Sequence, residues 1–251
     1  MLRAFFILVC LALPAQGEEV VAGLSQNRVA ITTNFDGSEI LIFGAVRREA
    51  PIPDDAPLEV IVAVSGPSEP VVVRKKARRY GIWVNDERVD VDAAPTFYAV
   101  ATSGPWDEVI SDTEDLRRKI SVPRAIRSVG APMDVANAES FAEAVVRIRK
   151  DEGLYQVLED TVTVQDSTLF NTSIALPANL TEGEYQTRIF LTRNRQVIDE
   201  YSTVINVQKV GLERWLYNLA HQQPLQYGLL SLTIAILAGW GASAFFRYLR
   251  G

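Results

Sequence analysis

Two apolar stretches at the ends of the chain stand out in the pattern of hydrophobic and polar positions. Near the N-terminus, residues 4–13 are apolar, with Arg3 before them and the small residues Ala15 and Gly17 after them. This is the arrangement of a secretory signal peptide, and about ten apolar residues fall short of the ~20 that a spanning helix needs. The pattern predicts that residues 1–17 are a signal peptide removed after Gly17.

The second apolar stretch, residues 225–246, runs for 22 positions without a charged side chain. At ~1.5 Å per residue a helix of this length measures ~33 Å, enough to cross a hydrocarbon core of ~30 Å. Arg247 and Arg250 follow directly, and basic residues prefer the cytoplasmic side of a membrane. We therefore predict one transmembrane helix over residues 225–246, a cytoplasmic tail over residues 247–251, and export of everything before the helix.

An amphipathic segment, residues 211–223, precedes the predicted span. Its apolar residues recur at helical spacing and form one stripe, and Pro224 then interrupts the pattern. Trp215 and Tyr217 are residue types enriched at the level of lipid headgroups. We expect a short helix lying on the membrane surface, with Trp215, Tyr217 and His221 at the interface. The stripe consists of Leu212, Trp215, Leu216 and Leu219.

Between these ends, alternation of apolar and polar residues predicts strands on both sides of a central segment. Residues 28–35 alternate, Asp36 and Gly37 then form a turn signal, and residues 38–46 follow as a more buried strand, which predicts a hairpin. The entry "LPANLTEGEY" into a closing hairpin near Tyr185 is common in immunoglobulin-like sandwiches. The expected fold class is mainly β, with one or more immunoglobulin-like β-sandwich units.

The period changes to a helical one in the central segment. Ser111 and Glu114 form a capping box that predicts a helix through Lys119, and a second helix is expected from near Asn137 to Gly153. The predicted organisation is a signal peptide (1–17), a periplasmic β unit (18–105), a helical insertion (106–153), a second β unit (154–208), an interfacial helix (211–223), a transmembrane helix (225–246) and a tail (247–251).

Composition narrows the possible chemistry. The formal net charge is -6, which disfavours nucleic acid as a partner. Cys10 is the one cysteine and lies in the predicted signal peptide, so the mature chain would hold no disulfide, zinc thiolate or thiol nucleophile. His221 is the one histidine and lies outside the predicted β domain, which excludes a histidine-based triad there. We expect no enzymatic activity, no cofactor and no metal site.

A basic cluster stands out against this acidic background. Five cations within six positions precede Tyr80 and Trp83, at the expected end of a strand and in its turn. They form either an ordinary charged hairpin that protects a sheet edge, or a binding surface, because like charges repel unless an anionic group meets them. The anionic options are phospholipid, an acidic partner surface and a small oxyanion, of which we favour the first two. The cluster consists of Arg74, Lys75, Lys76, Arg78 and Arg79.

A face of small residues lies along the predicted transmembrane helix. Ser231, Ala235, Gly239 and Ser243 recur every four residues, with Gly228 and Ala242 beside them. Such a face permits close approach of another helix, although small residues are frequent in membrane helices in any case.

Several segments together resemble the alphaproteobacterial family called "putative transmembrane protein". The resemblance covers nearly the whole mature chain and implies a Gram-negative inner-membrane protein with its β domain in the periplasm. It supplies no catalytic residue, and the family's association with sulfite-exporter-type permeases implies a permease as one candidate partner. The segments are "LSQNRVAITTNFDGSEILIFGAV", "RYGIWVN", "PTFYAVATS", "LPANLTEGEY" and "GLERWLYNLAHQQPLQYGLLSLTIAILAGW".

The function expected from these observations is that of a non-catalytic accessory or assembly protein for a membrane partner, such as a transporter. The expected partners are the lipid bilayer and either another membrane protein or further copies of this chain. The first alternative is a periplasmic anion-binding, ligand-binding or sensing module, and the second is a carboxylate-dependent hydrolase.

Overall fold

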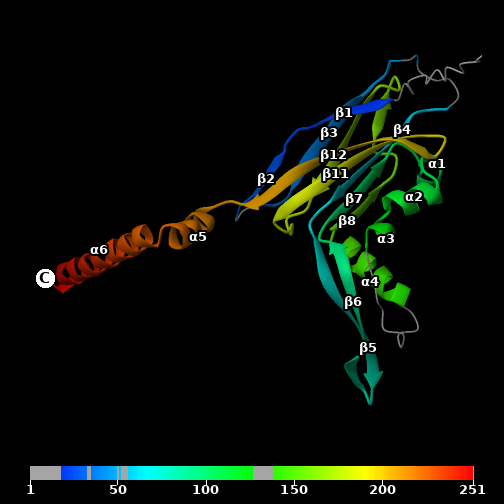
Figure 1. Cartoon of the computed structure of the whole chain (residues 1–251). Helices are drawn as coiled ribbons and strands as arrows, with labels where there is room; N and C mark the ends of the chain where they lie inside the picture. Colours follow the sequence, from blue (N-terminus) through cyan, green and yellow to red (C-terminus); the bar gives the residue numbers. More distant parts are fainter. Residues whose placement is uncertain (1–17, 33–34, 50, 52–55, 127–137, 251) are drawn as a thin grey trace, which may run out of the picture.

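The computed structural model describes residues 18–32, 35–49, 51, 56–126 and 138–250. Figure 1 shows a β domain, a long hairpin that projects from it, and a helical segment that leads away to the C-terminus. The chain is mainly β with one long C-terminal helix, as predicted. An immunoglobulin-like strand order stays a prediction.

The strands of the described residues form two larger sheets and one separate pair. The first sheet has the order β1-β3-β10-β9, the second has the order β2-β12-β11-β4-β7-β8, and β5 pairs with β6 alone. All neighbours are antiparallel except β2 with β12 and β7 with β8, which are parallel. The strands are β1 Glu19–Leu24, β2 Arg28–Ile31, β3 Ser38–Arg47, β4 Glu59–Ser65, β5 Ser68–Arg79, β6 Ile82–Pro95, β7 Tyr98–Thr102, β8 Tyr155–Leu158, β9 Thr163–Gln165, β10 Leu169–Leu176, β11 Gly183–Arg193 and β12 Gln196–Lys209.

Helices occur in two groups in the part of the chain that the structure describes. Four lie between β7 and β8, and two follow β12. They are α1 Trp106–Val109, α2 Asp112–Arg118, α3 Val122–Ala125, α4 Ala138–Asp151, α5 Leu212–Gln222 and α6 Pro224–Arg250. The Ser111 hydroxyl accepts a hydrogen bond from the Glu114 amide at 3.4 Å, so the predicted N-cap of α2 is present.

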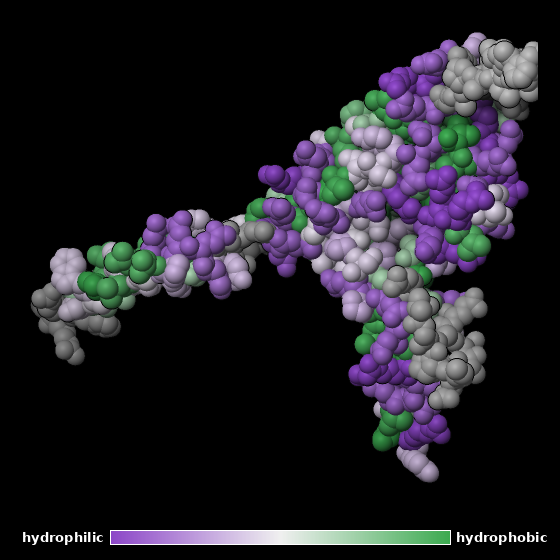
Figure 2. Space-filling view, in the orientation of Figure 1, coloured by the Kyte–Doolittle hydropathy of each residue, from purple (hydrophilic) through white to green (hydrophobic). Residues whose placement is uncertain are grey.

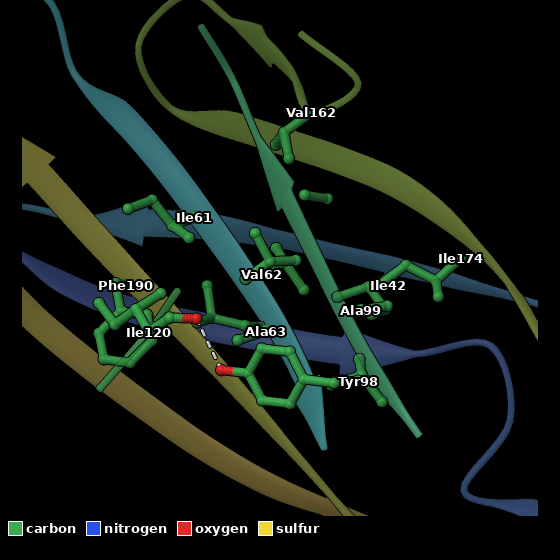
Figure 3. Packing of buried hydrophobic residues seen from close by; sticks show 14 of the residues in the cluster. Ile42, Ile61, Val62, Ala63, Tyr98, Ala99, Ile120, Val162, Ile174 and Phe190 are labelled. Carbon is green, nitrogen blue, oxygen red and sulfur yellow. Dashed lines mark hydrogen bonds between the residues drawn. The ribbon is translucent and has the colours of Figure 1, made fainter. Parts of the chain in front are cut away.

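The core lies between the two larger sheets and continues under the helices. Ile42 of β3 and Ile174 of β10 face Val62 of β4 in the sandwich interior (Figure 3). On the other face of β4, Ile61 packs near Ile120 of the α2–α3 connection. Helices therefore cover the second face of β4, which explains why residues 60–64 are buried without alternation.

Hydrogen bonds hold the α2–α3 segment onto this sheet. The Tyr98 hydroxyl donates to the Ile120 carbonyl at 2.7 Å (Figure 3), and the Arg188 guanidinium donates to the carbonyls of Arg118 and Lys119. Asp115 accepts from the Ile120 amide at 3.1 Å. These contacts satisfy backbone groups at the end of α2 that would otherwise be left without partners.

The hairpin predicted at Asp36 and Gly37 is wrong. These residues connect β2 with β3, but β2 pairs with β12 in the second sheet, whereas β3 pairs with β1 and β10 in the first. The turn signal marks a crossing between sheets, and Gly37 has φ of 114°, a value that suits glycine. Both sheets contain strands from before and from after the helices, so the two predicted β units share one core.

Candidate interaction surfaces

The β5–β6 hairpin is the most extended element of the β domain (Figure 1). At its base, Val71, Val73 and Val91 pack with Val145 of α4. At its far end, Tyr80 and Gly81 form the turn, with φ of 51° and 88°. Two residues with positive φ are the requirement of a type I′ turn, and this turn suits the twist of a two-stranded ribbon.

The five cations of the basic cluster lie within β5 and not in the turn, which corrects the sequence-based placement. Because successive side chains of a strand point to opposite faces, they divide between the two faces of the hairpin. Lys75 and Arg79 share one face. The Lys75 ammonium lies 3.3 Å from Glu87, and one Arg79 nitrogen donates to both carboxylate oxygens of Asp86 at 3.0 and 3.1 Å. Strand β6 therefore neutralises two of the five cations.

The other three cations, Arg74, Lys76 and Arg78, share the opposite face. All three are exposed, and none makes an ion pair with a residue that the structure describes. Trp83 lies directly across from Arg78 in the register of the two strands. We call Arg74, Lys76 and Arg78 the unpaired basic face.

Apolar and aromatic side chains crowd the end of this hairpin. Tyr80 is fully exposed at 106%, Ile82 is 65% exposed and Trp83 is 68% exposed. Figure 2 shows apolar surface next to hydrophilic surface at this end of the molecule. We call these three residues the hairpin tip. The tip and the unpaired basic face together form the first candidate interaction surface.

Helix α5 carries the residues predicted for the membrane interface. Trp215 and Tyr217 are exposed, and the ring of His221 stacks on that of Tyr217 with 4.0 Å between the centroids. The His221 Nδ1 atom lies 2.9 Å from the Tyr217 carbonyl oxygen. Their position at a membrane interface stays a prediction. Helix α5 ends at Gln222, two residues before Pro224, as the proline predicted.

Helix α6 is the one helix within the described residues that is long and apolar enough to cross a membrane. The candidate span is Pro224–Phe245, 22 residues, and none of it is buried inside the protein. The predicted span of residues 225–246 agrees with it to within one residue at each end. Residues 247–250 of the predicted tail continue the helix.

The small-residue face of α6 is open along the helix. Within it, the Ser231 hydroxyl donates to the Gly228 carbonyl at 3.0 Å, so this polar group is satisfied inside the helix. A Cβ atom placed on Gly239 would meet no atom within 4 Å. Nothing in the described protein contacts α6 along Ala235, Gly239 and Ser243 (Figure 1), so these residues are accessible to another helix.

A buried ion cluster, which the sequence reasoning missed, joins the start of the domain to its last hairpin. The Arg193 guanidinium donates to both Glu18 oxygens at 2.9 and 3.0 Å, and Arg48 also pairs with Glu18. The side chains of Glu18, Arg48 and Arg193 are 13%, 9% and 8% exposed. The one feature of the sequence that points to this cluster is the position of Glu18 directly after the predicted signal peptide.

The residues that the structure describes contain no group of three His, Cys, Asp or Glu side chains placed to hold a metal ion. The features that do stand out are a β domain, an exposed apolar helix of membrane-spanning length, and a charged hairpin.

A β domain carried on one C-terminal helix of this kind defines the class of the protein, a membrane protein anchored by a single helix. The sequence matches the family described as "Putative transmembrane protein (Alph_Pro_TM)" over residues 19–248. The chain belongs to this family. No match to a curated protein was found.

Proposed function

We propose that this protein is a non-catalytic accessory or assembly subunit of the bacterial inner membrane, with its β domain in the periplasm and its C-terminus in the cytoplasm. Its partner is another membrane protein, such as a permease, or a further copy of the chain. The observation that carries the proposal is the exposed surface of α6, none of which is buried by the rest of the protein. Lipid covers such a helix on most sides, and its small-residue face offers a second helix close approach.

The proposal includes export and removal of residues 1–17, which would make Glu18 the first residue of the mature chain. Glu18 directly follows the predicted cleavage site, and its carboxylate is already enclosed by two guanidinium groups. Cleavage after Gly17 would keep all three side chains of this cluster in the mature chain.

The main alternative, a binding module for a small anion, is supported less well by the hairpin. Arg74, Lys76 and Arg78 occupy every second position of an exposed strand, so their Cα atoms lie ~6.6 Å apart along a ribbon. A small-anion site needs several donors that converge in a concave pocket. The open arrangement fits a broad anionic surface better.

Affinity purification of the full chain in mild detergent, followed by mass spectrometry, tests the proposal. We expect one membrane protein, or the chain itself, to be recovered in a fixed ratio. The matched control is the same tag on a chain in which α6 is replaced by an unrelated spanning helix. Equal recovery of the same proteins with both helices would contradict the proposal.

A further inference from the structure

We propose that the hairpin tip and the unpaired basic face bind the anionic phospholipid surface of the membrane in which α6 is anchored. The β domain would then touch its own membrane at two places, through α6 and through the end of the β5–β6 hairpin. The inference rests on the membrane anchor and does not depend on the identity of a protein partner.

The charge pattern of the hairpin is the first observation. On one face, Glu87 and Asp86 neutralise Lys75 and Arg79. On the other face, Arg74, Lys76 and Arg78 lack such partners within the described residues, although the chain as a whole is acidic. Each cation close to anionic lipid adds to the attraction between a protein and the membrane surface. The three cations therefore select an anionic surface, while the acidic remainder of the chain is repelled by it.

The chemistry of the tip is the second observation. Tyr80, Ile82 and Trp83 project from a two-stranded ribbon, and no further strand or helix of the described residues covers them. Tyrosine and tryptophan place an apolar ring and a polar group side by side, which suits the boundary between acyl chains and headgroups. Insertion of the tip would remove these side chains from water and bring the adjacent cations to the phosphates.

The size of the surface favours lipid over protein. A stable protein–protein interface uses ~20–30 residues on each partner, whereas this surface consists of the tip and three cations. A bilayer requires no matching shape, so a narrow ribbon can enter it. A second copy of the same surface is disfavoured, because Arg74, Lys76 and Arg78 would meet identical cations.

The reach of the hairpin and the tether make the contact physically accessible. Six residues of β5, from Arg74 to Arg79, extend beyond the packed base, which at ~3.3 Å per residue is ~20 Å. The domain joins α5 through Gly211, which has φ of 155° and no neighbour around its missing Cβ. Rotation at Gly211 can turn the hairpin toward the bilayer. Because α6 holds the domain at the membrane, the hairpin meets lipid at an effective concentration of the order of mM, so a weak site is sufficient.

The test uses the full chain with Cys10→Ala and Ile82→Cys, which places the one thiol at the hairpin tip. The thiol is labelled with a dye whose emission shifts to the blue in apolar surroundings. The protein is reconstituted in vesicles of phosphatidylethanolamine and phosphatidylglycerol, or of phosphatidylcholine alone, with the β domain outside. We expect a blue shift and protection from iodide quenching in the anionic vesicles and neither effect in the neutral ones.

Two variants distinguish an effect of the unpaired basic face from an effect of the protein's net charge. Arg74→Ser, Lys76→Ser and Arg78→Ser together should abolish the blue shift. The matched control removes three exposed cations from α3 and α4 and should leave the shift unchanged. High salt should weaken the unmutated protein's response. Exposed charges are screened beyond ~8 Å at physiological ionic strength, and added salt shortens this distance. The control substitutions are Arg124→Ser, Arg147→Ser and Lys150→Ser.

Three results would overturn the proposal. The first is identical emission in anionic and neutral vesicles, and the second is a shift that survives loss of the three cations. The third is protection of the dye only after a membrane extract is added, since that assigns the tip to a protein. None of these results bears on whether a partner is recovered through α6, so the two proposals fail independently.

Discussion

At the scale of single residues, the most consequential contact is the one that encloses Glu18. Its carboxylate lies between Arg48 and Arg193, and all three side chains are largely withdrawn from water. Neighbouring Glu19 also pairs with an arginine, Arg47, but both of these side chains are exposed. The two consecutive glutamates thus provide a buried and an exposed version of the same interaction.

Glu18→Ala should lower the free energy of unfolding by about 3 kcal/mol, because two arginines would lose the carboxylate that compensates their burial. Glu19→Ala, the matched control, should cost less than about 1 kcal/mol, as exposed ion pairs do. Chemical unfolding of both variants in detergent, followed by circular dichroism of the β domain, measures the difference. Equal destabilisation by the two substitutions would show that the cluster does not support the fold as described.

Buried tyrosines set the behaviour of the domain at high pH. Burial raises the pKa of Tyr155 to about 12, and it also raises the pKa values of Tyr98 and Tyr185. The unfolded chain loses these protons near pH 10, before the folded chain does. The contribution of these tyrosines to stability should therefore be constant below about pH 10 and fall as the pH rises toward 12.

Tyr155→Phe should reduce this alkaline loss of stability. Its hydroxyl donates to the Pro95 carbonyl at 2.8 Å, and Arg149 donates to the same oxygen at 3.2 Å, so the carbonyl keeps a partner in the variant. Urea unfolding of both proteins at several values between pH 9 and 12 gives the slopes to compare. If the slope of the free energy of unfolding against pH is the same in both proteins, ionisation of Tyr155 does not contribute to the alkaline loss of stability.

At the scale of elements, the sequence predicted individual segments better than their partners. Alternation at Tyr185 and a proline at position 224 mark local geometry, and the structure has a strand and a helix boundary there. The pairing of β2 with β12 joins residues 28–31 to residues 206–209, and no local signal encodes such a contact. The turn signal at Asp36 and Gly37 therefore predicts a hairpin, although the chain crosses between sheets there.

The candidate surface was predicted in part for the same reason. The sequence shows five cations within six positions, but it does not show that β6 supplies Glu87 and Asp86 to two of them. A register shift between Lys75 and Lys76 helps to set which residues oppose one another. Only the pairing of the two strands reveals that Arg74, Lys76 and Arg78 make no ion pair within the described residues.

Helix α6 gives a prediction at the same scale. Gly239→Ile, alone or with Ala235→Leu, should weaken recovery of the partner or homodimer several-fold, because a larger side chain holds a neighbouring backbone away. Leu237→Ile changes the opposite side of the helix and serves as the control. Co-purification in mild detergent measures recovery, and membrane fractionation confirms that every variant still inserts. Recovery that is the same for all variants would assign the small-residue face to chance composition.

At the scale of the whole molecule, the orientation in the membrane is a prediction from the two ends of the chain. The predicted signal peptide over residues 1–17 and the basic residues Arg247 and Arg250 both predict an outward-facing β domain. A reporter that is active only in the cytoplasm should therefore work when fused after Gly251. A reporter that is active only in the periplasm should work when placed after Lys209. The opposite result would contradict the proposed topology: a periplasmic reporter active after Gly251 and a cytoplasmic reporter active after Lys209.

The parallel pair β2–β12 also constrains the order of events during synthesis. A ribosome makes the chain from its N-terminus, yet β2 must wait for residues 206–209, and Glu18 must wait for Arg193. The edge of the second sheet can close only after β12 has emerged, and α6 begins shortly afterwards, at Pro224. The last strand of the domain and the anchoring helix α6 are therefore synthesised close together in time. A nascent chain released before β12 is made would have an incomplete second sheet and no α6 to hold it at the membrane.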